Sequence, residues 1–155
     1  MAYSFPLFID LEDNNCVIIG GGDYAANCAH ILLKFHAKIT VISPHLCDSL
    51  RDLEKAQKIR YIPRKYYRGD CSTACLCIAA TDNESINISI SVECKAKGVP
   101  VNISKPAAFG NFSFPSVILH DGISIAVSGE GSSQSEDEIC ERIKGVLPNF
   151  LKVDK

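Results

Sequence analysis

Short apolar runs alternate with amphipathic stretches from residue 16 to residue 104. The runs predict strands at 16–20, 38–43, 59–63, 75–82 and 99–104, and residues 17–19 lack the polar alternation of a half-exposed strand. The stretches between them predict helices at 23–35, 49–58 and 83–98, by helical spacing of apolar residues or by charged ends. Strands that alternate with helices indicate crossover units and a mostly parallel sheet, so we expect an α/β fold.

The pattern changes after residue 111. Residues 112–129 predict two antiparallel strands that turn at Asp121 and Gly122, and residues 135–151 predict a final helix. We therefore expect a parallel-sheet domain at residues 1–112 and a small α+β region, a hairpin plus a helix, at residues 113–155.

Composition narrows the class of protein. The chain has 155 residues, 22% of them charged, and a formal net charge of −2. The sequence has no basic cluster of the kind that would indicate nucleic acid as a partner. It also has no apolar stretch of the roughly 18 residues that span a bilayer. The N-terminal residues lack the pattern of a signal peptide, so we expect no membrane partner and a cytoplasmic location.

Eight cysteines are many for this length. Most lie in apolar segments, which indicates reduced thiols that pack as small hydrophobic side chains. Cys71, Cys75 and Cys77 are close in sequence, but their spacing lacks a C-x2-C pair and a nearby histidine. We therefore predict no metal site from this spacing.

A glycine turn joins the first predicted strand to the first predicted helix. Gly20, Gly22 and Ala25 match G-x-G-x-x-[GA], the pattern of a dinucleotide-binding turn in that position. The first glycine permits the tight turn, the second lets a diphosphate approach the backbone, and the small third residue lets helix and strand pack closely. The alternative is a glycine turn that serves packing alone.

The ends of the other strands should line the same crevice. The acidic residue that would hold ribose hydroxyls is absent after the second strand, where Ser43 stands as either a ribose donor or a turn residue. With no arginine at that point for a 2′-phosphate, NAD is favoured over NADP. Thr81 and Asn102 end later strands and are predicted neighbours of the cofactor, whereas Asp82 is predicted to cap the following helix.

Four stretches together resemble a known family. They read FPLFIDLEDNNCVIIGGGDYAA, CIAATDNESIN, VPVNIS and FSFPSVILHDGISIAVSGEGSS, in the order found in precorrin-2 dehydrogenases, which are also the N-terminal modules of siroheme synthases. The resemblance covers about residues 4 to 149. It implies a Rossmann-type domain, a small dimerisation region and a homodimer. It also implies NAD-dependent oxidation of precorrin-2, a tetrapyrrole, to sirohydrochlorin, with insertion of ferrous iron in some members.

The resemblance also implies roles for single residues. Asp23 and Tyr24 would lie along the cofactor with Gly22, and Pro44 and His45 would join Ser43 near the adenosine.

One family residue is replaced in this chain. Lys105 stands where the family commonly has an aspartate used in dehydrogenation and metal insertion, so it would pair with substrate carboxylates or be a solvated side chain. His120 is a candidate for metal insertion, although a hairpin turn explains it equally well. The alternative to an active dehydrogenase is an altered relative that binds nucleotide or tetrapyrrole without catalysis. Many relatives continue into a further helical region, which the sequence to Lys155 does not include.

Overall fold

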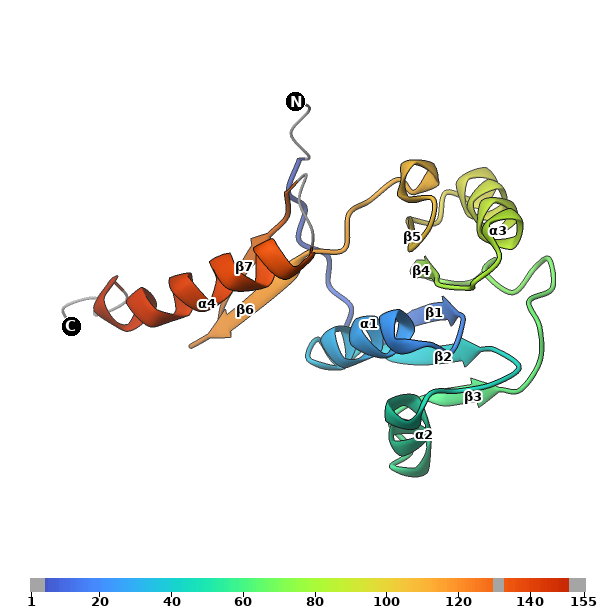
Figure 1. Ribbon diagram of the computed structural model, residues 1–155, viewed down its shortest axis with the longest axis horizontal. Helices are drawn as coiled ribbons and strands as arrows, with labels where there is room; N and C mark the ends of the chain where they lie inside the picture. Colours follow the sequence, from blue (N-terminus) through green and yellow to red (C-terminus); the bar gives the residue numbers. More distant parts are fainter. Residues whose placement is uncertain (1–4, 130–132, 151–155) are drawn as a thin grey trace. The chain divides into compact units, whose positions relative to one another are not determined.

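The computed structural model describes the backbone of residues 5–129 and 133–150, and side chains at 5–129 and 136–147. It divides into two compact units (Figure 1). Residues 9–112 form the larger unit, and residues 5–8 group with the part of the chain from Ser113 onward. The division after Phe112 coincides with the change in sequence pattern, whereas residues 5–8 do not group with the predicted parallel-sheet domain.

A five-stranded parallel sheet forms the centre of the larger unit, in the order β3-β2-β1-β4-β5. The strands are β1 Asn15–Ile19, β2 Lys38–Ile42, β3 Arg60–Ile62, β4 Leu76–Ala79 and β5 Val101–Ile103. The chain adds β2 and β3 on one side of β1 and then β4 and β5 on the other. This order confirms the predicted Rossmann-type α/β fold and places the topological switch point between β1 and β4.

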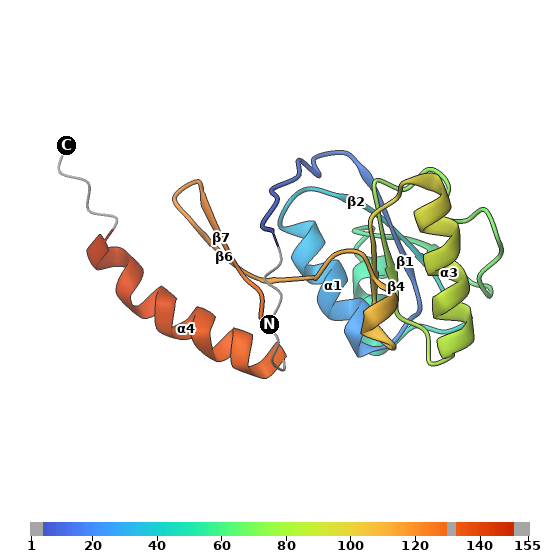
Figure 2. The ribbon, with the colours of Figure 1, turned by 90° about the horizontal axis from the view of Figure 1, so that it is seen from above.

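Helices cover both faces of this sheet. They are α1 Asp23–Leu33, α2 Asp48–Lys55 and α3 Glu84–Lys97, followed by the short 3-10 helix η1 Ala107–Phe109. Figure 2 shows α1 and α3 on opposite sides of the strands. Ala25, Ala29 and Leu32 of α1 are buried, as their spacing predicts, and Ile90 of α3 joins the core on its own side. In the described part of the chain, no helix combines the length and the apolar character needed to cross a bilayer.

The ends of α3 show one correction. Asn83, not Asp82, caps the helix, because its side chain accepts a hydrogen bond of 3.1 Å from the Ile86 N–H. Asp82 lies one residue too early for its side chain to take that position. At the other end Gly98 adopts a left-handed conformation, as the predicted helix end requires.

The smaller unit contains a β-hairpin and a long helix. Strands β6 Ser116–His120 and β7 Ile123–Val127 pair antiparallel, which confirms the predicted hairpin. Asp121 and Gly122 connect them with positive φ values of 47° and 79°, as a two-residue hairpin turn of type I′ demands. Helix α4 Ser133–Phe150 begins two residues before the predicted start. It packs Cys140 and Leu147 against Ile118 of β6.

Candidate functional site

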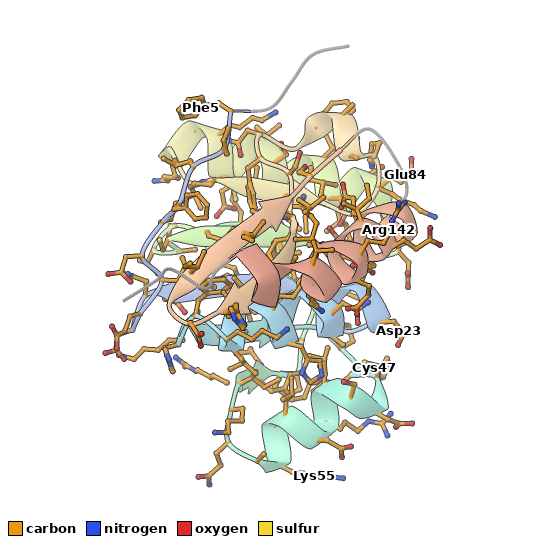
Figure 3. The ribbon with its side chains drawn as sticks, turned by 90° about the vertical axis from the view of Figure 1, so that its left-hand side faces the viewer. Phe5, Asp23, Cys47, Lys55, Glu84 and Arg142 are labelled. Carbon is orange, nitrogen blue, oxygen red and sulfur yellow. The ribbon has the colours of Figure 1, made fainter. Side chains whose placement is uncertain are left out.

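The carboxyl ends of β1 and β4 lie side by side at the switch point. Ile19 is paired with Ala79 across this parallel pair, so the glycine turn and Thr81 leave the sheet at the same edge. Figure 3 labels Asp23, Cys47 and Glu84, which stand at or next to the starts of α1, α2 and α3, and shows them along one side of the unit. This edge is where open α/β sheets bind their ligands.

The backbone conformation and the close packing at position 20 both require glycine. The φ of Gly20 is +128°, and a β-carbon there would lie 2.2 Å from the carbonyl oxygen of Ala80. Its N–H donates to the Ile42 carbonyl at 2.9 Å, which ties the turn to the end of β2. Packing between neighbouring strand ends therefore explains this glycine.

Gly21 is a second packing glycine, which the G-x-G-x-x-[GA] pattern passes over. A β-carbon there would lie 1.9 Å from the His45 carbonyl oxygen and 2.8 Å from Ser43 Oγ. Its own carbonyl accepts a hydrogen bond of 2.7 Å from the Cys47 N–H. The loop after β2 thus closes directly onto the glycine turn.

Gly22 differs from both of its neighbours. It is the N-cap of α1, at φ −89° and ψ −172°, and gives the helix no side-chain cap. Apart from Gly22 and its immediate neighbours along the chain, no atom lies within 4 Å of the position that a β-carbon would take. Packing therefore does not require this glycine, and the first amides of α1 lie behind an open approach. Amides at a helix N-terminus favour an anion such as a diphosphate.

The segment after β2 borders a surface hollow of about 340 Å³. It is lined by Pro44, His45, Leu46, Arg51, Glu54 and Tyr61. Ser43 is only 7% exposed, and its hydroxyl lies against the backbone of the glycine turn. Arg51 of α2 donates from Nε to the Leu46 carbonyl and pairs with Asp48 at 3.1 Å. The sequence did not predict Arg51 as a site residue, because it lies in a helix and not at the end of a strand.

Two predicted cofactor neighbours, far apart in sequence, meet in the fold. The Tyr24 hydroxyl, at the start of α1, donates a 2.6 Å hydrogen bond to Asn102 Oδ1 on β5. Asn102 is 9% exposed, and its Nδ2 donates to the Phe112 carbonyl at 3.2 Å. The bond fixes the Tyr24 side chain beside the glycine turn.

Cys28 lies one helical turn after Tyr24 in α1 and is buried. Burial raises the pKa of the Cys28 thiol to about 12, and a hydrogen bond involving Tyr24 opposes the rise only in part. Cys28 is therefore a protonated thiol at neutral pH, so it supplies no thiolate to this edge of the sheet.

Asn87 of α3 joins two further candidates and was not predicted from the sequence. It is fully buried. Its Oδ1 accepts from the Thr81 N–H at 3.1 Å and the Thr81 hydroxyl at 2.7 Å, while its Nδ2 donates to the carbonyls of Thr81 at 2.9 Å and Lys105 at 2.8 Å. One amide side chain thereby holds together the segments that follow β4 and β5.

The two proposed catalytic candidates lie in different units. Lys105 is exposed in the segment after β5, where its backbone is held by Asn87. His120 ends β6 in the smaller unit, with its Nε2 3.5 Å from Asp121 Oδ2. The structure thus connects Lys105, Thr81 and Asn87 in one network, and separately connects Tyr24 with Asn102.

Comparison with known proteins agrees with this geometry. Residues 7–116 match the sequence profile of the family described as "Putative NAD(P)-binding". The chain belongs to this NAD(P)-binding family. The match covers the glycine turn and every strand of the parallel sheet, so the cofactor to be fitted is a nicotinamide dinucleotide.

Curated relatives of this family member are siroheme synthases. The one from Thioalkalivibrio sulfidiphilus (strain HL-EbGR7) is 39% identical over 145 residues, which are 93% of this chain and 30% of the relative. The one from Pseudoalteromonas atlantica (strain T6c / ATCC BAA-1087) is 34% identical over 127 residues, 82% of this chain and 28% of the relative. The chain therefore spans about 30% of the length of these relatives.

A solved structure shares the fold. It is described as SirC, precorrin-2 dehydrogenase, and superposes with a TM-score of 0.71 over 92% of this chain and 70% of that chain. The sequence identity is 22%.

The residues at the switch point fit the dinucleotide of an NAD(P)-binding protein. Gly22 leaves its backbone uncovered, α1 presents amides without a side-chain cap, and the hollow beside Pro44 and His45 opens next to the end of β2. A diphosphate beside Gly22 and an adenosine in the hollow beside Pro44 and His45 would follow the usual direction of binding across such a sheet.

Replacing Asn87 by leucine is expected to lower the free energy of unfolding by about 2–4 kcal/mol, because partly buried backbone groups of Thr81 and Lys105 would lose their hydrogen-bond partner. Urea denaturation followed by circular dichroism measures the change. The matched control is Asn27→Leu on the exposed face of α1, expected to stay within about 0.5 kcal/mol of wild type. Equal effects of the two substitutions would show that the network is not what holds these segments.

Proposed function

We propose that the chain is a dehydrogenase module that oxidises precorrin-2 to sirohydrochlorin with NAD. The observation that carries the proposal is the uncovered backbone of Gly22, at the start of α1 and beside the switch point. The siroheme synthase relatives and the fold shared with SirC, precorrin-2 dehydrogenase, support the choice of substrate.

The proposed roles follow the positions of the residues. Gly20 and Gly21 shape the turn, and Gly22 with the amides of Asp23 and Tyr24 binds the diphosphate. Ser43, Pro44 and His45 contact the adenosine side. Thr81, which follows β4, and Asn102, which lies within β5, orient the nicotinamide side. The bound dinucleotide supplies the acceptor for the hydride that leaves precorrin-2 together with a proton.

We infer NAD rather than NADP from the surroundings of the hollow. Arg51 is the cation on its wall, but Asp48 pairs with its guanidinium and the Leu46 carbonyl takes its Nε–H. A 2′-phosphate would have to compete with the Asp48 carboxylate for Arg51, whereas a ribose hydroxyl would not. Titration of the chain with NAD and with NADP should therefore show tighter binding of NAD.

Lys105 is the proposed contact for the carboxylates of the tetrapyrrole. Its side chain is exposed, and Asn87 fixes its backbone next to Thr81. An ammonium group provides a point charge for a carboxylate but does not replace the aspartate that relatives commonly have there. This difference favours a second candidate function, a module that binds nucleotide or tetrapyrrole without oxidising it.

An assay with precorrin-2 and NAD separates the two candidates. For the wild-type chain we expect formation of NADH and sirohydrochlorin, both followed by absorbance. Lys105→Ala should raise KM for precorrin-2 more than it lowers kcat, since it removes a binding contact and no reacting group. Activity found only in Lys105→Asp would overturn the dehydrogenase proposal and support the non-catalytic one.

A homodimer formed by the smaller unit is part of the proposal. Its hairpin exposes Leu119 and Ile123, and its helix α4 exposes Ile139 and Val146, each between 42% and 48%. Exposed apolar residues on both elements support an interface there. A cytoplasmic location and a ferrochelatase activity using His120 stay predictions.

A further inference from the structure

Three cysteines that are distant in sequence meet in the core of the larger unit. Cys71 precedes β4, Cys77 lies within β4, and Cys94 lies in α3. Each is fully buried, and their three sulfur atoms all lie within 4.8 Å of one another. The Cys71 and Cys77 sulfurs are 3.4 Å apart. Cys75, which the sequence spacing grouped with Cys71 and Cys77, is replaced in this cluster by Cys94.

The geometry points to a binding site for a single thiophilic metal ion held by Cys71, Cys77 and Cys94. Thiolate sulfur is a soft ligand that selects Cu(I), Zn(II) or iron–sulfur clusters. An iron–sulfur cluster is ordinarily held by four cysteines, whereas these three converge on one point. The site is separate from the glycine turn and does not depend on the proposed dehydrogenase function.

The loop that carries Cys71 is held rigidly in place. Arg64 binds the Asp70 carboxylate through two nitrogen atoms at 2.7 and 2.8 Å. The Glu93 carboxylate accepts hydrogen bonds from the Gly69 N–H at 2.9 Å and the Cys71 N–H at 3.2 Å. Both contacts fix the backbone that leads into Cys71, as supporting residues do around metal ligands.

Glu93 also bears on which ion fits. Three sulfur atoms suffice for Cu(I), whereas Zn(II) takes four ligands in closed sites. Glu93 precedes Cys94 in α3, and its carboxylate already contacts the Cys71 backbone. That carboxylate lies outside the three-sulfur group, and its two oxygens already accept hydrogen bonds from the Tyr66 hydroxyl and from the Gly69 and Cys71 amides. The described residues therefore supply three ligands, which favours Cu(I). The surrounding side chains, including Ala74, Ile90 and Val99, are buried and apolar, which favours direct protein ligands over water.

Binding must release protons from the thiols. One ion replaces up to three S–H hydrogens, and these leave to solvent as the three metal–sulfur bonds form. No oxidant or reductant is consumed. The affinity is therefore expected to fall as the pH is lowered.

The test uses the full chain, reduced and freed of metal by a chelator, without oxygen. Titration with Cd(II) should give a thiolate charge-transfer absorption that saturates at one equivalent, and Cu(I), which binds thiolates more tightly than Cd(II), should then displace the Cd(II). In the double variant Cys71→Ala/Cys94→Ala the affinity for Cd(II) should fall by more than about 100-fold. Loss of residues that only support metal ligands lowers metal affinity about 10- to 100-fold, and loss of two ligands should cost more. The matched control Cys16→Ala/Cys28→Ala removes two buried thiols outside the cluster and should bind as wild type does.

No saturable absorption in wild type, or equal affinity in the double variant, would overturn the proposal. If the double variant does not fold, X-ray absorption of the wild-type chain with one equivalent of Zn(II), and separately of Cu(I), decides. Three sulfur neighbours per ion support the site, and fewer contradict it.

Discussion

Gly20→Ala is expected to destabilise the chain by more than about 3 kcal/mol, the sum of backbone strain and a steric clash. The φ of +128° is rarely adopted by a residue with a side chain, and the new methyl group would meet the Ala80 carbonyl oxygen at 2.2 Å. Since Ala80 directly follows β4, relief of the clash would push the ends of β1 and β4 apart. Urea denaturation gives the change in the free energy of unfolding.

Gly69→Ala separates the two causes. Gly69 has a φ of +107° in a loop, and no atom lies within 4 Å of its β-carbon position. It should show the strain alone, about 1–2 kcal/mol. If Gly20→Ala is no worse than Gly69→Ala, the close approach of the two strand ends is not a real constraint.

Gly22→Val is expected to abolish cofactor binding while the fold is kept. The φ and ψ of Gly22 suit any residue, and its β-carbon position is open. The cost in stability should therefore stay near 1 kcal/mol, as for other apolar N-caps. The valine methyl groups would occupy the space through which a diphosphate reaches the α1 amides. Calorimetry should show affinity for NAD reduced by at least about 100-fold, or about 2.7 kcal/mol.

Gly22→Ser is the matched variant that makes this result specific. Serine is a good N-cap, so α1 should be as stable as in wild type or more so. Its hydroxyl would bond the same amides that we assign to the diphosphate, so NAD affinity should fall although stability does not. Unchanged affinity in both variants would place the cofactor elsewhere.

The fold could be predicted because its signals are local. The apolar run at residues 17–19, the glycine turn and the Asp121-Gly122 dipeptide each determine the conformation of their own segment. Even the error at the start of α3 is local, since Asp82 and Asn83 are both good caps and differ only in position.

The missed residues act through partners distant in the chain. Asn87 is the fourth residue of α3, and its role depends on Thr81 and Lys105 meeting there. Gly21 occupies a position that the G-x-G-x-x-[GA] pattern leaves unspecified. Its need for glycine comes from the His45 carbonyl, which is more than twenty residues away in the chain. Cys94 joins Cys71 and Cys77 only once α3 packs on β4. Sequence spacing carries no signal of such contacts.

The most direct measurement is a titration of the 15N-labelled chain with NAD, followed by the NMR shifts of backbone amides. If the start of α1 holds the diphosphate, the Gly22, Asp23 and Tyr24 amides should shift most, and in proportion to saturation. Saturating NAD that leaves those three amides unmoved, while others shift or none do, would contradict the assignment of this turn as the cofactor site.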